Sequence, residues 1–263
     1  MQITNPEIDK GKAFDWGRTS ELYAKFRDIY PEIFYQKIIA RNIGLKHQKI
    51  LDLGTGTGVL PRNLYAYGAE WTGIDISENQ IIQAKKLAEQ QNMQITFQAC
   101  SAEQANFPEN YFDAVTACQC FWYFNHEILT PILSKILKQN GKILILYMAW
   151  LPLEDTIAKA SEELVLQYNP DWTGAGEIRK QIAIPEAILS EFKLISHEEF
   201  DVKIPFTRDS WHGRMQACRG VGASLSEHAL AEWQQEHKNL LEKIAPENFE
   251  ILHYIAIAEL IKK

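Results

Sequence analysis

The stretch "KILDLGTGTGVL", residues 49–60, decides the fold, because it joins a short apolar run to three alternating glycines. The apolar run has the length of a buried β-strand, and a helical pattern begins directly after the glycines. Gly54, Gly56 and Gly58 let the backbone of this turn lie directly against a ligand. In open α/β sheets, ligands bind beyond the carboxyl ends of strands. The turn therefore predicts a ligand site.

Two common ligands are disfavoured by the spacing of these glycines. A nucleoside triphosphate loop needs Gly-Lys-Ser/Thr after its first glycines, and no such triplet follows. The dinucleotide fingerprint G-x-G-x-x-G fits at Gly54 and Gly56, but Val59 stands at its sixth position and Gly58 falls one place early. The spacing therefore excludes the triphosphate loop and fits the dinucleotide fingerprint poorly.

The chain from 48 to 149 alternates short apolar runs with helical segments. This alternation is typical of βαβ units in a parallel sheet that is covered on both faces. Ser77 is expected to cap one helix, and Gly141 is expected to end another in a left-handed conformation. Cys118 and Cys120, two residues apart in an expected strand, are predicted to point to the same face.

The flanking segments complete this pattern. Residues 17–43 predict one or two helices. Residues 192–206 and 248–263 alternate apolar and polar side chains as strands do, and residues 207–245 between them are helical in composition. The segment 151–185 is expected to begin with a helix.

The glycine turn resembles the motif D/E-x-G-x-G-x-G of class I S-adenosylmethionine-dependent methyltransferases, with Asp52 at its acidic position. The resemblance is to small-molecule enzymes, the group that includes ubiquinone and menaquinone biosynthesis enzymes and trans-aconitate methyltransferase. It implies a Rossmann-like α/β fold with a seven-stranded, mostly parallel sheet in the order 3-2-1-4-5-7-6. The seventh strand would be antiparallel, and helical insertions would form a cap. The turn would hold the amino-acid part and the ribose of S-adenosylmethionine.

Two further elements extend the resemblance. Asp75 ends the next expected strand, 17 residues beyond Gly58, where a carboxylate can accept hydrogen bonds from both ribose hydroxyls. The stretch "SAE", residues 101–103, occupies the place where the family approaches the adenine amino group.

The N-terminal stretch "FDWGRTSELYAKFRDIYP", residues 14–31, resembles the segment that covers the cofactor in these enzymes. Its pattern Y-x-x-x-R-x-x-Y-P begins at Tyr23, and the guanidinium of Arg27 suits the methionine carboxylate. The resemblance covers residues 14–149 and matches the last strands by pattern only. The cofactor contacts it implies are Tyr23, Arg27, Asp52, Gly54, Thr55, Gly56, Gly58, Asp75, Ile76, Gln80, Ser101, Ala102, Glu103, Cys118 and Gln119.

The methyl acceptor is less well marked. In-line methyl transfer needs chiefly a nucleophile held close to the methyl group, so no single catalytic residue is obligatory. Relatives of the trans-aconitate type often read Q-x-x-H-W-F-D after the fourth strand, whereas this chain has Trp122, Tyr123 and Asn125 in place of the His, Trp and Asp. The acid–base candidates are His126, Tyr147 and His212. The candidates for substrate binding are Trp16, Trp122, Tyr123, Trp150, Trp211, Arg214 and Arg219.

Arg214 and Arg219, together with His212, would suit an acceptor that carries a carboxylate or another anion, but an amphipathic helix with solvated charges is the simpler interpretation of them. Neither the acceptor nor its reacting atom follows from the sequence.

The length of the chain predicts its domain organisation. With 263 residues the chain is expected to form a single methyltransferase domain. Within it, residues 1–45 would form a helical cover, residues 46–150 the cofactor-binding core, and residues 151–185 and 207–245 a cap over the acceptor.

The formal net charge of −7 argues against a nucleic-acid surface. No apolar run is long enough to span a bilayer, and the N-terminus shows no secretion signal, so we expect a cytoplasmic protein without a membrane partner. The four cysteines lack metal-ligand spacing, which predicts reduced thiols and no metal. The protein would be a monomer or a homodimer.

The sequence thus predicts methyl transfer from S-adenosylmethionine to O, N or C of a small molecule. A domain that binds the cofactor without catalysis shares every motif described above and remains an alternative. An NAD-dependent oxidoreductase is a weaker alternative, because Val59 replaces the third glycine of the dinucleotide fingerprint.

Overall fold

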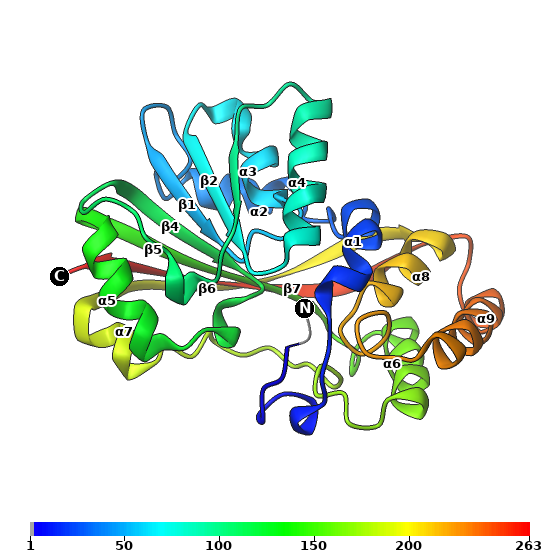
Figure 1. Cartoon of the computed structure of the whole chain (residues 1–263). Helices are drawn as coiled ribbons and strands as arrows, with labels where there is room; N and C mark the ends of the chain where they lie inside the picture. Colours follow the sequence, from blue (N-terminus) through cyan, green and yellow to red (C-terminus); the bar gives the residue numbers. More distant parts are fainter. Residues whose placement is uncertain (1–2) are drawn as a thin grey trace. The chain divides into compact units, whose positions relative to one another are not determined.

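A computed structural model describes residues 3–263 and contains one seven-stranded sheet (Figure 1). Its strand order, β3-β2-β1-β4-β5-β7-β6, confirms the predicted order. The strands are β1 (Lys49–Leu53), β2 (Glu70–Asp75), β3 (Thr96–Ala99), β4 (Phe112–Cys118), β5 (Leu137–Trp150), β6 (Phe192–Thr207) and β7 (Asn248–Lys262).

The sheet is mixed. β1 pairs in parallel with β2 and β4, β2 with β3, and β4 with β5. The end of β7 lies at the start of β5, where Lys262 Nζ donates to the Leu137 carbonyl. It also lies at the start of β6, where Lys263 N donates to the Glu191 carbonyl. β7 therefore runs antiparallel to both neighbours, as predicted.

The chain divides into two compact units. Unit 1 contains residues 3–29, 149–179 and 201–254 of the described chain, and unit 2 contains residues 30–148, 180–200 and 255–263. Three of the five boundaries fall inside β5, β6 and β7, so each of these strands has residues in both units.

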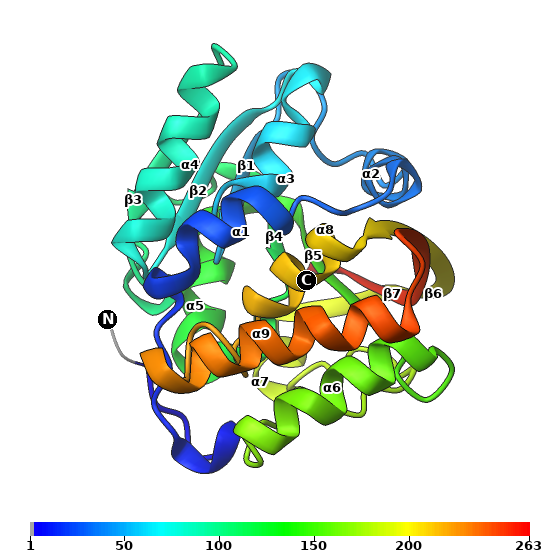
Figure 2. The ribbon, with the colours of Figure 1, turned by 90° about the vertical axis from the view of Figure 1, so that its right-hand side faces the viewer.

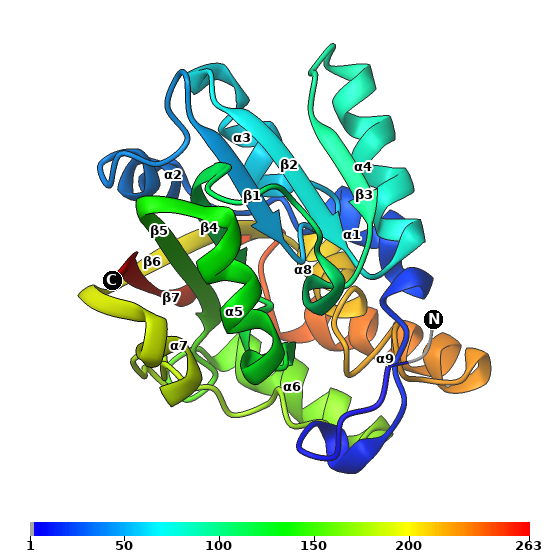
Figure 3. The same cartoon turned by 60° about the vertical axis from the view of Figure 1, so that its left-hand side comes forward.

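Helices cover both faces of the sheet in unit 2. Figure 3 shows α5 in front of the strands and α3 behind them. α4 forms a separate small core, in which Ile81, Ala84 and Ala88 pack against Phe97 of β3. Ser77 stands at the N-cap of α4 as predicted, although its side chain makes no capping hydrogen bond among the described residues. The helices of unit 2 are α2 (Glu32–Ile39), α3 (Val59–Asn63), α4 (Glu78–Gln90), α5 (His126–Ile136) and α7 (Glu186–Glu191).

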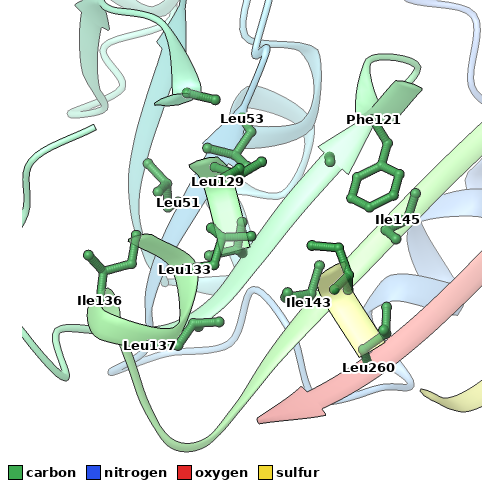
Figure 4. Packing of buried hydrophobic residues seen from close by; sticks show 14 of the residues in the cluster. Leu51, Leu53, Phe121, Leu129, Leu133, Ile136, Leu137, Ile143, Ile145 and Leu260 are labelled. Atoms are coloured by element: carbon green, nitrogen blue, oxygen red, sulfur yellow. The ribbon is translucent and has the colours of Figure 1, made fainter. Parts of the chain in front are cut away.

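The main core of unit 2 lies between the strands and α5 (Figure 4). Leu129, Leu133 and Ile136 form the buried face of the helix, and Leu51 and Ile143 meet them from β1 and β5. Strands that are buried on both faces read as continuous apolar runs, which is why the sequence pattern located them.

Unit 1 contains the helices that the sequence placed after β5 and before β7. α6 and α9 run side by side (Figure 2), and α8 contacts both α1 and α9. α6 begins where the Asp155 carboxylate accepts from the backbone of Ile157 and Ala158. Residues 207–245, predicted to be helical, form two helices. The helices of unit 1 are α1 (Ser20–Phe26), α6 (Thr156–Tyr168), α8 (Arg208–Gln216) and α9 (Glu227–Ile244).

Short 3-10 helices connect several of these elements. They span Asp9–Gly11, Trp16–Thr19, Tyr65–Tyr67, Ala102–Gln104 and Phe121–Tyr123. Within residues 3–263, no helix combines the length and the apolar character needed to cross a bilayer.

Two local expectations were wrong. α5 ends at Ile136 and not near Gly141, and Asn140, with φ 63°, takes the left-handed conformation. The register of β5 against β4 jumps from Leu137 to Lys142, so the turn "KQNG" is an irregularity inside β5. β4 ends at Cys118, and Gln119 then turns the chain with φ 65°, so Cys120 does not share a strand face with Cys118.

Candidate functional site

The glycine turn follows β1 in unit 2, and all three of its glycines have positive φ, at 57°, 55° and 75°. At two of these positions, neighbouring side chains leave no room for a Cβ, so packing requires glycine. A Cβ on Gly54 would lie 2.8 Å from Cys120 Cβ, and one on Gly58 would lie 2.6 Å from the Phe97 ring. A Cβ on Gly56 would meet no atom of the described residues within 4 Å. The backbone at Gly56 is therefore open to the close approach of a ligand.

Asp52 supports this turn from beneath. It is buried at the end of β1, and its carboxylate accepts hydrogen bonds from Thr55 Oγ1 and Thr116 Oγ1, both at 2.6 Å. Burial raises the pKa of Asp52 to about 7; the two hydroxyl bonds oppose this shift, and the charge of Asp75 adds to it. Thr116 was not predicted, although it lies directly opposite Asp52 in the β1–β4 register.

Asp75 joins the second motif to the first. Its Oδ2 accepts from the Gly56 amide at 2.9 Å, and its Oδ1 accepts from the Ser77 amide at 2.8 Å. Burial raises the pKa of Asp75, and these two amide bonds counteract the rise. The structure thus places the predicted ribose carboxylate one hydrogen bond from the open glycine. Of its two predicted neighbours, Ile76 is exposed and Gln80 is buried.

The third motif lies beside the second. The Cys100 amide donates to the Asp75 carbonyl at 2.9 Å, which fixes the start of the Ser101–Glu103 segment at the end of β2. Glu103 Oε1 accepts from the Asn125 amide at 2.9 Å, and Ala102 is part of the core. The three motifs therefore meet at the carboxyl ends of β1, β2 and β3.

Cys118 and Gln119 lie at the carboxyl end of β4, the strand next to β1. The Cys118 thiol lies 3.3 Å from the hydroxyl of Tyr30, and Gln119 Nε2 donates to the Met148 carbonyl at 2.5 Å. The left-handed conformation of Gln119 carried no sequence signal, because residues other than glycine adopt it only occasionally.

Three candidates for the acceptor site lie together in unit 2. The Trp122 ring meets the Tyr147 ring edge-on at 5.0 Å and lies 5.7 Å from the Tyr123 ring. Trp122 remains 42% exposed despite its size. His126 begins α5, and partial burial lowers its pKa. The structure therefore groups aromatic candidates on the segments that follow β4 and end β5.

The remaining candidates lie in unit 1. Arg27 packs over the Tyr23 ring at 4.8 Å, and Trp16 meets that ring at 5.6 Å. Because Tyr23 and Arg27 belong to unit 1 and the glycine turn belongs to unit 2, their shared role at a cofactor stays a prediction.

Two of these candidates have structural partners that account for them. Arg219 forms an ion pair with the buried Asp9 at 2.7 Å and also donates to Thr173 at 3.0 Å. Trp211 is fully buried, and its indole N–H donates to Ser161 Oγ at 3.0 Å. Their expected role in substrate binding stays a prediction.

Arg214 and Trp150 form a pair in the interior of unit 1. The guanidinium lies 4.8 Å from the centre of the Trp150 ring, and its Nη1 donates to Cys218 Sγ at 3.0 Å. The Trp150 indole N–H donates to the buried Glu162 at 2.5 Å. Burial raises the pKa of Glu162. These contacts fix the plane of the indole against which Arg214 packs.

His212 is part of a buried hydrogen-bonded chain between α8, α9 and α6. Its Nδ1 lies 2.9 Å from Nδ1 of His237, whose Nε2 lies 3.1 Å from Ser161 Oγ. Ser161 donates its only proton to the Ile157 carbonyl, so His237 carries its proton on Nε2 and accepts from His212 at Nδ1. These hydrogen bonds account for the burial of His212 without a role in catalysis.

Across the part of the chain that the structure describes, no three His, Cys, Asp or Glu side chains are grouped so that they could hold a metal ion.

Comparison with known proteins finds similarity to methyltransferases over part of the chain. Residues 50–141 match the family described as "Methyltransferase domain". A ubiquinone biosynthesis O-methyltransferase of Coxiella burnetii (strain RSA 331 / Henzerling II) is 39% identical over 151 residues, which are 54% of this chain and 64% of that protein. The chain thus spans just under two thirds of the length of this curated relative.

Two solved structures share the fold. Phosphoethanolamine N-methyltransferase 2 of Haemonchus contortus, in complex with phosphomonomethylethanolamine and S-adenosylhomocysteine, is 20% identical with a TM-score of 0.54, over 93% of this chain and 57% of that one. The [4+2]-cyclase SpnF is 19% identical with a TM-score of 0.52, over 88% and 80% of the two chains. At these identities the likeness shows the fold alone.

The sheet order and the solved structures together show a Rossmann-like α/β fold of the kind found in class I methyltransferases. The match of residues 50–141 to the methyltransferase-domain family agrees with the resemblance drawn from the motifs.

Proposed function

We propose that this protein transfers the methyl group of S-adenosylmethionine to a small-molecule acceptor. The observation that carries the proposal is the hydrogen bond from the Gly56 amide to the Asp75 carboxylate, at a glycine where an added Cβ would meet no atom of residues 3–263 within 4 Å. The relative from Coxiella burnetii is called an O-methyltransferase, which supports methyl transfer as the reaction class.

The residues of unit 2 fit this cofactor. Asp75 uses one lone pair of each oxygen on a backbone amide, which leaves lone pairs for two ribose hydroxyls. Gly56 gives the amino-acid part room against the backbone, and Ser101–Glu103 would border the adenine. Arg27 would pair with the methionine carboxylate, as the sequence resemblance implies.

The cofactor supplies an electrophilic methyl group on a sulfonium. The protein's contribution is to hold the nucleophile of the acceptor in line with that group and to exclude water, because alignment supplies most of the acceleration. His126, Tyr147 and His212 remain candidates for a base, which is needed only if the acceptor must lose a proton.

A fold of this type does not by itself decide the chemistry, since a structural neighbour is called a cyclase. Binding of the cofactor without catalysis therefore stays an alternative. Release of S-adenosylhomocysteine from S-adenosylmethionine across a panel of metabolites tests the proposed reaction, with the Gly56→Ala variant as a low-activity control. Cofactor binding without turnover of any acceptor would favour the alternative.

The finer expectations stay predictions. They are a single domain whose segments 151–185 and 207–245 cap the acceptor, a cytoplasmic location, no nucleic-acid or membrane partner, and a monomer or homodimer. Gel filtration with light scattering measures the last of these.

A further inference from the structure

His253 on β7 has one imidazole nitrogen for which the described residues offer no hydrogen-bond partner. The side chain is buried in unit 1, and its Nδ1 lies 2.9 Å from the Ile251 carbonyl. A carbonyl only accepts, so Nδ1 bears the proton and Nε2 bears a lone pair. Nε2 is buried and has no hydrogen-bond partner among residues 3–263. Buried acceptors without a partner are uncommon in native proteins, and leaving one costs about 1–3 kcal/mol.

The surroundings of His253 are aromatic and cationic. Phe206 stacks on the imidazole at 6.1 Å, and Trp150 meets it edge-on at 6.3 Å. Arg214 packs over the same Trp150 ring. The pKa of His253 is lowered to about 3: burial is the largest cause, the hydrogen bond to the Ile251 carbonyl opposes it, and the positive charges of Arg214 and Arg27 add to the lowering. The ring is therefore neutral at physiological pH.

The other buried histidines of this unit behave differently. His212 and His237 satisfy each other and Ser161 through the chain described above. A histidine with a purely structural role would be expected to find such partners, because buried polar groups in native proteins are usually hydrogen-bonded. His253 instead combines a fixed tautomer, an unused lone pair and a neighbouring positive charge.

We propose that His253 Nε2 and the Arg214 guanidinium are the two polar contacts of an acceptor subsite in unit 1 that takes a small organic acid bearing a hydroxyl or N–H group. This inference rests on the proposed function and names the substrate class of the reaction. The guanidinium pairs with the carboxylate, the imidazole lone pair accepts from the hydroxyl or N–H, and the rings of Trp150 and Phe206 contact the body of the ligand. His253 is thus a positioning group that accepts a hydrogen bond and takes up no proton.

Three acids that carry a donor, each with its methyl ester, form the probe set: 4-hydroxybenzoate, 4-hydroxyphenylacetate and tyrosine. Binding to the full chain is measured by ligand-observed NMR in the presence of S-adenosylhomocysteine. We expect at least one acid to bind about tenfold more tightly than its ester, since a charge-assisted hydrogen bond is lost in the ester. If none of the three acids binds more tightly than its ester, the proposal is overturned.

The variants separate the two contacts. His253→Phe keeps an aromatic ring between Phe206 and Trp150 and removes the lone pair, so we expect about tenfold weaker binding of the preferred acid. Arg214→Gln should remove the preference for the acid over its ester. The matched control is His197→Phe on β6, because His197 also has a buried Nε2 without a partner but lies in unit 2. Equal affinity in His253→Phe and His197→Phe contradicts the proposal.

The imidazole resonances of the wild-type protein report binding at His253 directly, without a variant that could misfold and without enzyme turnover. In a long-range ¹H–¹⁵N spectrum of the wild-type protein, the Nε2 resonance of His253 should shift when the acid is added, while that of His197 stays unchanged. An unmoved His253 resonance with bound acid also overturns the proposal. Calorimetry with S-adenosylhomocysteine on the same samples tests the cofactor alone, so its failure is distinguishable from failure of the subsite.

Discussion

At the scale of single residues, the three glycines of the turn have separate tasks. Gly54 and Gly58 make room for Cys120 and Phe97, whereas Gly56 faces open space. Sequence spacing identified the motif, but it could not assign these tasks, because they depend on side chains from β3 and from the segment after β4.

Alanine at two of these glycines should therefore have different effects. Gly58→Ala adds a clash with the Phe97 ring to the cost of a left-handed alanine, so it should lower the free energy of unfolding by about 2–5 kcal/mol. Gly56→Ala should lower it by only about 1–2 kcal/mol. Urea unfolding of both variants measures the difference, and equal losses would contradict the assignment.

Asp52 makes stability depend on pH in a direction that is unusual for a carboxyl. Its pKa rises from 3.8 in the unfolded chain to about 7 in the folded protein, so the folded protein binds the extra proton between these values. The contribution of Asp52 to stability is full below pH 3.8 and is lost as the pH rises through about 7. Asp52→Asn, which cannot ionise, should reduce the fall in unfolding free energy between pH 5 and pH 7.5.

The exposed Glu109→Gln variant is the control for this measurement. An unchanged pH slope in Asp52→Asn would show that the buried carboxyl titrates normally.

Site residues were predictable where a local motif marks them and not elsewhere. Asp75 was found because it lies at a fixed distance from the turn at the end of an apolar strand. Thr116 was missed because its role comes from the register between two strands. His253 was missed because a lone histidine in the apolar run of β7 reads as a core residue.

At the scale of elements, the strands and most helices followed from their periodicity, and the errors lie where the backbone departs from it. The end of α5 was placed too late because residues 138–141 insert an irregularity into β5. Asn140 and Gln119 both adopt positive φ. Residues other than glycine adopt this conformation only occasionally, so the sequence did not indicate it.

The packing of α6, α8 and α9 depends on two neutral histidines. Burial lowers the pKa of both His212 and His237; the charge of Lys238 adds to the lowering at His212, and Asp209 opposes it. The unfolded chain, with an ordinary histidine pKa near 6.5, therefore binds more protons than the folded protein below that pH. Stability from this pair is full above pH 6.5 and is lost as the pH falls through the lowered values.

Replacement of His237 by Gln should therefore flatten the loss of unfolding free energy between pH 6.5 and pH 5, at the cost of lower stability at pH 7.5. Urea unfolding at the three pH values measures both effects. The exposed His228→Gln variant on the same helix is the control. A slope that changes as much in His228→Gln as in His237→Gln would contradict the role of the buried pair.

At the scale of the whole molecule, the sheet order and the similarity to methyltransferases were predictable, because the class I pattern is a series of local signals in a fixed order. The division into two units was not predictable, since three of its five boundaries fall inside continuous strands. Unit 2 holds the glycine turn and its aspartates, and unit 1 holds His253 and Arg214. The acceptor is the part of the function that the family leaves open, because relatives in this fold differ in the reactions for which they are named.

Calorimetric titration of the full chain with S-adenosylhomocysteine tests the central claim most directly. We predict saturable binding at one site per chain, about tenfold or more weaker in Gly56→Ala, because the added Cβ enters the space against the turn. Gly176→Ala is the matched control: Gly176 also has positive φ and open space around its Cβ position, but it lies in unit 1, and we expect its affinity to equal that of the wild type. Absence of any binding heat with the folded wild-type protein, or equal affinity in Gly56→Ala and Gly176→Ala, would contradict the account.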